Sequence, residues 1–379
     1  MRDILLLLAA LTVSASTDQV PPVTDLVVHE WGTLTSIAGE DGLPVEWLPL
    51  TGQSDLPCFV ERSSFTVKGS IAGTVRMETP VLYFYAPRET AVAVNVRFPN
   101  GVVTEWFPHA AVAQSNVPLR SGSASRIRWP HVLVRPGAAE HFQAENALSH
   151  YYTARQTSAN PLRVGGSDEK FLFYRGVGNF ALPIAATVDG ADTVTIRRLD
   201  RDDVGDVILF TNHGGRMAYE VRRIVGGQES IEPRATDAIP AAELERMLLD
   251  AGMFADEAAA MIDTWRDSWF EEGTRLFYVV PRAAIDAVLP LDITPTPTGI
   301  ARAFVGRMEL LTNDEAREIN GALDTNDGET LQKYGRFLYA FARRLGRPVL
   351  APPVLAASSE PGDQTPRTRL DVTRPVYSR

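Results

Sequence analysis

Cysteine is almost absent from this chain, and its absence limits how the fold can be held together. Cys58 is the only cysteine among 379 residues, so no intramolecular disulfide can form and stability must come from packing. Its neighbours Pro57, Phe59 and Val60 are apolar, and no base lies beside it in the sequence. These surroundings favour a buried structural thiol over a reactive nucleophile.

The chain also lacks an excess of positive charge. Acidic residues outnumber basic ones by 47 to 37, which gives a net charge of −10. Such a chain repels a phosphate backbone, and the sequence shows no basic patch, so we expect no nucleic-acid partner. Hydrophobic residues make up 45% of the chain and charged residues 22%, which is typical of globular proteins with a sizeable core.

The N-terminus has the pattern of a secretory signal peptide over residues 1–16. Arg2 supplies a positive start, Ile4 to Val13 form an apolar run, and Ser14-Ala15-Ser16 offers small residues for cleavage. The run is shorter than the roughly 20 residues that a membrane helix needs. We therefore expect an exported protein, periplasmic or extracellular, with no membrane span after signal cleavage. A buried N-terminal helix is the alternative.

Turn signals predict antiparallel β structure in the first half of the mature chain. Thr90 to Phe98 alternates apolar and other residues, Asn100-Gly101 supplies a tight turn, and Val102 to Phe107 runs back as the partner strand. Two further hairpins are predicted around Asp189-Gly190 and around residues 212–215. Three hairpins without intervening helices favour a sandwich or barrel-like region.

The second half of the chain mixes helices and strands. Helical spacing predicts helices at 241–251, 256–270, 313–323 and 329–345, and strands are expected at 276–280 and 303–309. Thr312 and Glu315 have the spacing of a capping box. From residue 346 onward prolines recur without periodicity, which predicts a disordered tail.

These patterns predict an α+β fold in which an antiparallel β-rich, sandwich-like N-terminal region precedes a smaller α+β C-terminal region. The expected domains are a β-rich unit at 17–226 and an α+β unit at 227–345, between the signal peptide and the 346–379 tail. Residues 121–166 have weak periodicity and are expected to form an irregular insertion in the first unit.

The segment His29-Glu30-Trp31-Gly32-Thr33 is the first candidate for chemistry. A regular strand sends His29 and Glu30 to opposite faces, so the two cannot bind one ion unless Gly32 forms a bulge. His29 and Trp31 share a face and together can line a pocket. The zinc-protease pattern is absent because no second histidine has the required spacing.

Three charged residues on later strands are further candidates. Arg76 and Glu78 lie two apart on one strand face and can form an ion pair, for which a surface position is the default expectation. Pro80 indicates an edge or a bulge there. Arg175 precedes Gly176 and can grip a carboxylate or phosphate of a ligand, or an acidic side chain of the other domain.

The predicted helix 256–270 carries two stripes at helical spacing. The apolar stripe is expected to pack into the core, and the acidic stripe is expected to be a solvated face, with a divalent cation as the alternative. The apolar stripe consists of Met261, Trp265 and Trp269, and the acidic stripe of Asp263, Asp267 and Glu271.

Four strings together resemble a group of uncharacterised exported bacterial proteins that carry a His-Glu-Trp-Gly-Thr segment. They are residues 29–33, Arg76-Met77-Glu78-Thr79-Pro80, residues 171–180 and residues 268–273. The resemblance spans residues 25–309. It implies export and a shared architecture, and it implies no activity.

Two classes of function follow. The first is a non-catalytic exported binding or envelope-associated protein, whose unknown ligand or envelope component sits in a groove lined by aromatic and arginine side chains. Its candidate ligand-binding residues are Trp31, Arg76, Arg175 and Trp269. No complete catalytic, nucleotide or dinucleotide motif is present, and no cofactor is evident from the motifs.

The alternative is an exported hydrolase, with metal assistance as an option, whose histidine and glutamate residues meet only in the fold. Its catalytic candidates are His29, Glu78, Glu271 and Glu272. A divalent metal would be held by His29, Asp267 and Glu271. This hypothesis requires His29 and Glu78 to converge in one pocket.

Overall fold

A computed structural model describes residues 25–51, 56–63, 71–115, 119–145, 149–190 and 192–347. The predicted signal peptide at 1–16 and nearly all of the predicted tail at 346–379 lie outside the described residues. Within the described ranges, no helix is both long and apolar enough to cross a membrane.

The largest element is a ten-stranded sheet with β1 (Val27–Ile37) in its interior. All neighbouring strands are antiparallel except β1 and β19, which run parallel. In spatial order the strands are β16 (Arg234–Thr236), β14 (Arg216–Arg223), β13 (Asp206–His213), β17 (Gly273–Val279), β19 (Gly299–Leu310), β1, β3 (Val75–Tyr85), β10 (Leu172–Gly178), β5 (Gly101–Phe107) and β2 (Glu61–Arg62).

Two smaller sheets cover one face of this sheet. The six-stranded sheet contains β18 (Leu291–Thr294), β4 (Thr90–Phe98), β7 (Ser125–Val134), β8 (Leu162–Val164) and β9 (Ser167–Glu169), with β6 (Ala111–Gln114) also paired to β7. The three-stranded sheet contains β11 (Ile184–Val188), β12 (Val194–Arg198) and β15 (Gln228–Ile231). Apolar side chains from all three sheets form one continuous core, which is the arrangement of a β-sandwich.

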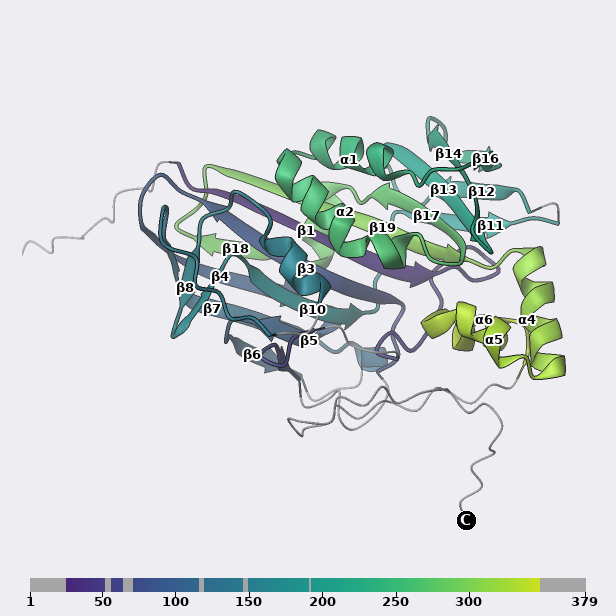
Figure 1. Cartoon of the computed structure of the whole chain (residues 1–379), viewed down its shortest axis with the longest axis horizontal. Helices are drawn as coiled ribbons and strands as arrows, with labels where there is room; N and C mark the ends of the chain where they lie inside the picture. Colours follow the sequence, from purple (N-terminus) through teal and green to yellow (C-terminus); the bar gives the residue numbers. More distant parts are fainter. Residues whose placement is uncertain are drawn as a thin grey trace, which may run out of the picture.

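Helices cover the opposite face and one end of the large sheet (Figure 1). The face is covered by α1 (Ala241–Asp250), α2 (Ala255–Trp269) and the short η3 (His150–Arg155), which share a second apolar core with the sheet. The end is covered by α4 (Asn313–Thr325), α5 (Gly328–Lys333), η4 (Gly335–Phe337) and α6 (Leu338–Arg344), packed on Ile37 and Trp47. The described ranges also contain two short helices, α3 (Arg282–Val288) and η2 (Leu119–Ser121).

The predicted α+β class with a β-rich, sandwich-like N-terminal region is confirmed. Helices lie mostly in the C-terminal part, and the capping box of Thr312 and Glu315 opens α4 as expected. The expected division at 226–227 falls within the large sheet, because β17 and β19 pair with β13 and β1. The hairpins β11–β12 and β13–β14 are also confirmed.

The hairpin predicted from Thr90 to Phe107 is wrong, although both of its strands exist. β4 pairs with β7 and β18 in the six-stranded sheet, whereas β5 pairs with β10 and β2 in the large sheet. The Asn100-Gly101 turn therefore carries the chain from one layer of the sandwich to the other. Alternation identifies a strand but does not identify its partner.

Three other expectations need correction. The predicted irregular insertion at 121–166 contains the ten-residue strand β7. The helix predicted at 329–345 is interrupted at Gly335, whose φ of +47° is a left-handed conformation. Cys58 is exposed rather than buried, and its backbone N–H donates to Glu145. Its apolar neighbours turn inward while the thiol does not.

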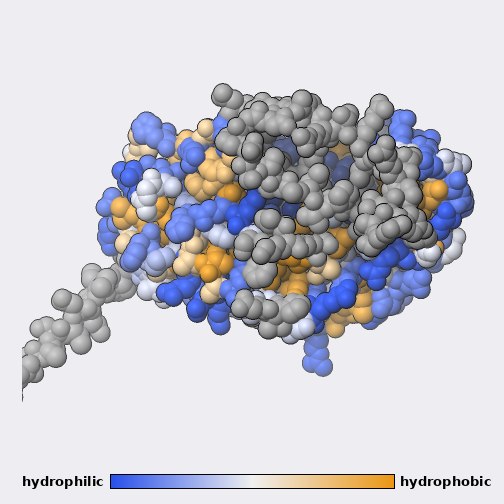
Figure 2. Space-filling view, turned by 90° about the horizontal axis from the view of Figure 1, so that it is seen from below, coloured by the Kyte–Doolittle hydropathy of each residue, from blue (hydrophilic) through white to orange (hydrophobic). Residues whose placement is uncertain are grey.

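Viewed from below in Figure 2, the coloured surface mixes hydrophilic residues with small hydrophobic groups, without one dominant apolar face. The large apolar side chains that are exposed among the described residues are scattered: Leu43, Leu199, Val225, Leu249 and Phe254. Such isolated exposure is ordinary for a globular protein.

A substitution at Gly32 can test the packing of the sandwich. The pairing register of β1 and β3 shifts beside this residue. A Cβ at this position would lie 2.8 Å from the buried ring of Phe304 and 3.1 Å from the backbone of Pro80. We expect Gly32→Ala to lower the free energy of unfolding by about 1–3 kcal/mol, measured by urea denaturation. The control is Gly166→Ala, which meets nothing within 4 Å. Equal stability of the two variants would contradict the packing described here.

Candidate functional site

The His29–Thr33 segment lies in the middle of β1 and projects to both faces of the sheet. His29 and Trp31 face the helices, whereas Glu30 faces the sandwich core, as the alternation of a strand predicts. The register shift between Trp31 and Thr33 is a bulge opposite Thr79 and Pro80. The two charged residues therefore belong to different polar groups.

His29 is held by the first turn of α2. Its Nδ1 lies 2.7 Å from a carboxylate oxygen of Glu257, which is fully buried. Tyr85 donates to the other oxygen at 2.7 Å, and the N–H of Phe254 donates to Glu257 at 2.8 Å. Burial and the Glu257 carboxylate raise the pKa of Tyr85, so its hydroxyl stays protonated. This group joins β1 and β3 to the N-terminus of α2.

Glu30 is part of a structural network on the other face. Tyr174 and the Nε of Arg302 each donate to its carboxylate at 2.5 Å, and Arg302 also donates to Asp286 at 2.7 Å. Glu30 is fully buried and Arg302 is 4% exposed, so the pair is closed to solvent. The network links strands β1, β10 and β19 to α3.

Two contacts fix the course of α2 along β1. The first is the Glu257–His29 bond, and the second joins the Ser268 hydroxyl to Arg307 at 3.4 Å. Arg307 is the register partner of Thr35. The helix α2 therefore runs in the same direction as β1, from the level of His29 to the level of Thr35. The rise is about 17 Å along the helix between these contacts and about 20 Å along the strand. Trp265 and Trp269 therefore lie over the Thr33–Thr35 half of β1.

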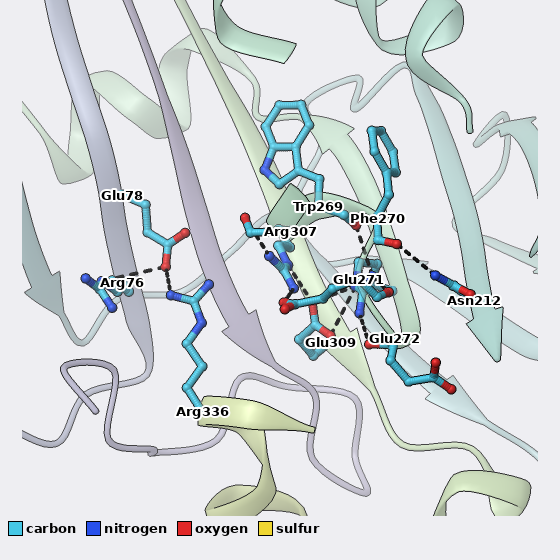
Figure 3. A network of polar contacts seen from close by, with 12 residues as sticks. Arg76, Glu78, Asn212, Trp269, Phe270, Glu271, Glu272, Arg307, Glu309 and Arg336 are labelled. Atoms are coloured by element: carbon cyan, nitrogen blue, oxygen red, sulfur yellow. Dashed lines mark hydrogen bonds and ion pairs between the residues drawn. The ribbon is translucent and has the colours of Figure 1, made fainter. Parts of the chain in front are cut away.

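Glu78 on β3 lies beside that half of β1, because it pairs with Thr33. Arg76 approaches it to 3.6 Å and Arg336 donates a hydrogen bond to it (Figure 3). Burial alone would raise the pKa of Glu78, but Arg336 and Arg76 outweigh it and lower the pKa to about 2. Burial, only partly offset by Glu78, lowers the pKa of Arg76 to about 10. The expected surface pair is thus a buried one, with Glu78 only 1% exposed.

A second ion-pair group lies across β1 on β19 and β17. Glu309 is 1% exposed and accepts from Arg275 at 3.0 Å and from Arg307 at 2.6 Å. Arg307 also donates to Glu271 at 2.6 Å. Burial would raise the pKa of Glu309, but the two guanidinium groups keep it below its ordinary value. Both groups lie on one side of the sheet, with β1 between them (Figure 3).

Phe337 connects the two groups. The guanidinium carbon of Arg307 lies 5.1 Å from the centre of its ring, and that of Arg336 lies 4.9 Å away. Trp47 packs on the same ring at 5.6 Å. The C-terminal helices are therefore attached to the sheet at the place where the two groups meet.

Several buried polar atoms at this place have no hydrogen-bond partner within the described part of the chain. They come from adjacent positions of β1, β3 and α2, and all face the same layer. They are Thr33 Oγ1, Thr35 Oγ1, Glu78 Oε2, Trp265 Nε1 and Trp269 Nε1. Native proteins leave few such atoms, and each calls for a water, a ligand or a functional reason. We call this set the unpartnered strip.

The structure also places the other residues that the sequence suggested as site residues. Trp31 is fully buried and packs on Tyr83, while Arg175 donates to Thr79 at 2.9 Å. Glu272 accepts from the N–H of Gly214, in the β13–β14 hairpin, at 2.9 Å. Glu78, Arg76, Trp269 and Glu271 are thus brought together, and Glu272 is not.

The metal candidates have separate partners. His29 bonds Glu257, the exposed Asp267 lies 3.2 Å from His150, and Glu271 bonds Arg307. Among the residues that the structure describes, no group of three or more histidine, cysteine, aspartate and glutamate side chains is arranged to hold an ion. A divalent metal thus remains a prediction without an assigned site.

The position of α2 on the sheet shows which of the two predicted stripes is buried. Met261, Trp265 and Trp269 are buried against the sheet, as predicted. Asp263 and Asp267 of the acidic stripe face outward and pair with Arg266 and His150. Glu271 lies beyond the end of α2 and instead turns toward the sheet, where it pairs with the buried Arg307.

Comparison with known proteins gives no family for this chain. Neither the protein-family models nor the curated proteins contain a match. The resemblance drawn from the four sequence strings therefore stays a prediction.

Sequence reasoning missed the partners that complete the site. Glu257, Arg307, Glu309 and Arg336 were not singled out, because each lies more than 200 residues from the candidate it contacts or within an ordinary strand pattern. One signal was available for two of them: Arg307 and Glu309, together with Arg302, are the charged residues of a strand that is otherwise apolar.

The pKa of Glu78 predicts an acid-sensitive component of stability. Its folded pKa of about 2 lies below the ordinary value of 4.5, so the ionised carboxylate stabilises the fold above pH 4.5. This component, about 3 kcal/mol from the size of the shift, is lost as the pH falls from 4.5 toward 2. We expect Glu78→Gln to be less stable at pH 7 and to lose less stability in that window.

Urea unfolding at a series of pH values measures this effect. The control is Glu89→Gln, because Glu89 is exposed and forms no ion pair with another residue of the described ranges. It should follow the wild type throughout. A Glu78→Gln profile parallel to the wild type between pH 4.5 and 2 would contradict the assigned pKa.

Proposed function

We propose that this protein is a non-catalytic, exported binding protein that holds a small polar ligand between β1 and α2. The observation that carries the proposal is the unpartnered strip. Leaving a buried donor or acceptor unsatisfied costs about 1–3 kcal/mol, so five such atoms in one layer are expensive unless a bound molecule satisfies them.

The chemistry of the strip favours a neutral ligand that carries hydroxyl groups. The indole N–H groups only donate, Glu78 Oε2 only accepts, and the threonine hydroxyls do both. The neighbouring guanidinium groups are already matched with carboxylates: Arg76 and Arg336 with Glu78, and Arg275 and Arg307 with Glu309 and Glu271. A polyol or sugar offers the mixture of donors and acceptors that remains.

The ligand reaches the strip by displacement of the C-terminal helices. Thr33 and Thr35 are fully buried, so residues that cover them must move to admit a ligand. Phe337 and Arg336 follow the left-handed Gly335 and contact the ion pairs beside the strip, Phe337 at Arg307 and Arg336 at Glu78. Arg336 holds this segment to Glu78, and the side chain of Arg336 is 18% exposed at the edge.

The hydrolase remains the alternative, and the His29–Glu257 pair is the feature that favours it. A histidine whose Nδ1 is held by a buried carboxylate has the arrangement of a general base. Its proposed partner Glu78 shares the helix-covered face but pairs with Thr33, four residues along β1, or about 13 Å from the His29 position. Each of the two is bonded within its own group, so binding is the better-supported function.

Removal of the threonine hydroxyls tests the proposal. In Thr33→Val and Thr35→Val an unsatisfied hydroxyl is replaced by a methyl group of similar shape. We expect each substitution to raise the unfolding free energy of the ligand-free protein by about 1–3 kcal/mol, measured by urea denaturation. The control is Thr264→Val, because this buried hydroxyl donates to Ala260 at 2.7 Å and its loss should destabilise.

Ligand binding is measured by calorimetric titration with a panel of neutral sugars and polyols, with small carboxylates for comparison. The wild type and Thr264→Val should bind the same panel members, whereas Thr33→Val with Thr35→Val should not. Destabilisation by the two β1 substitutions, or binding that survives them, would count against the proposed site.

A further inference from the structure

The outer face of the six-stranded sheet carries a concentration of arginine in an acidic protein. β7 alternates strictly at its start: Ser125, Ile127 and Trp129 are buried, whereas Arg126 and Arg128 are exposed. The whole chain has a net charge of −10, so a basic surface here is a local feature of the fold. In the sequence these arginines are not recognisable as a basic patch, because residues 121–166 have weak periodicity and the strand that aligns them is not expected there.

Arg126 and Arg128 have no ion-pair or hydrogen-bond partner among the side chains that the structure describes. Their neighbours on β6 are Ala113 and Ala111, which are exposed and too short to cover a guanidinium group. Both side chains are therefore open to solvent on an uncovered sheet surface. Nothing in the described fold requires their charge.

The pairing of β4 with β7 adds a third arginine to the same surface. Arg97 lies directly opposite Arg126, and like charges in opposite positions destabilise a sheet. Asp292 on β18 lies 3.4 Å from Arg97 and offsets part of the repulsion. Arg126 has no carboxylate partner among the described residues that would offset its repulsion from Arg97.

The surface continues along β7 toward its far end. Arg135 and Arg163 lie there and share one carboxylate, Asp168, with Arg135 at 3.6 Å. From Arg126 to Arg135 the strand advances about 30 Å. Five arginines thus face two aspartates, Asp168 and Asp292, which leaves a net charge of +3 along one track.

We propose that this track, Arg97, Arg126, Arg128, Arg135 and Arg163, binds a linear anionic polysaccharide. Guanidinium groups bind carboxylate and sulfate groups in a bidentate manner. Arg126 and Arg128 are about 7 Å apart along one strand, which matches successive charges on an extended chain better than a single small anion. The net negative charge of the rest of the protein confines binding to the track.

Two other polyanions fit the surface less well. Nucleic-acid binding to single strands uses exposed aromatic side chains for base stacking, and the outward positions of β4, β6 and β7 carry no phenylalanine, tyrosine or tryptophan. Insertion into a lipid surface uses exposed apolar side chains, and the exposed large hydrophobic residues of the described ranges all lie elsewhere.

The experiment measures binding of the full-length mature protein to polygalacturonate and to heparin, with neutral dextran as the uncharged probe. The double variant R126Q/R128Q is compared with R222Q/R223Q, which removes two charges from exposed positions of β14. We expect binding of the wild type and of R222Q/R223Q at low salt, and an affinity for R126Q/R128Q that is lower by about tenfold or more. Binding should weaken as salt rises.

Failure of the wild type to bind either polyanion at low salt would overturn the proposal, as would equal losses in the two double variants. Tighter binding to single-stranded DNA or to anionic vesicles than to both polysaccharides would assign the track to a different partner and would also overturn it. Circular dichroism of each variant checks that the sheet is intact.

Discussion

The structure depends on β1 being buried on both faces and paired on both edges. Its parallel contact with β19 joins residues about 270 apart in the sequence, and its antiparallel contact with β3 sets the bulge at Gly32. A strand so enclosed can carry polar side chains only when other elements bring partners to them. His29 and Glu30 receive theirs from α2 and β19, whereas Thr33 and Thr35 receive none among the described residues.

The enclosure of β1 also determines where the candidate site lies. Because α2 runs along β1, its indole groups lie over the threonines, and the two ion-pair groups flank them from β3 and β19. Arg336 and Phe337 then attach the C-terminal helices over this place. The site is therefore built from β1, β3, α2, β19 and the C-terminal helices, and none of these parts has a recognisable motif alone.

The sequence predicted the local elements better than their assembly. Alternation identified β4 and β5, but it could not show that they enter different layers, because partner choice depends on long-range packing. The opposite directions of the His29 and Glu30 side chains followed from strand geometry. The sequence could not show that Glu257, rather than another acidic residue of α2, is the partner of His29. Burial of Arg76 and Glu78 depends on Arg336, which lies about 260 residues away.

A high-resolution crystal structure of the full chain tests the central claim most directly. The account predicts electron density from a non-protein molecule within hydrogen-bond distance of the Thr33 and Thr35 hydroxyls and of Glu78 Oε2. Direct bonds from these three groups to other protein atoms, with no such density between them, would contradict the proposed binding site.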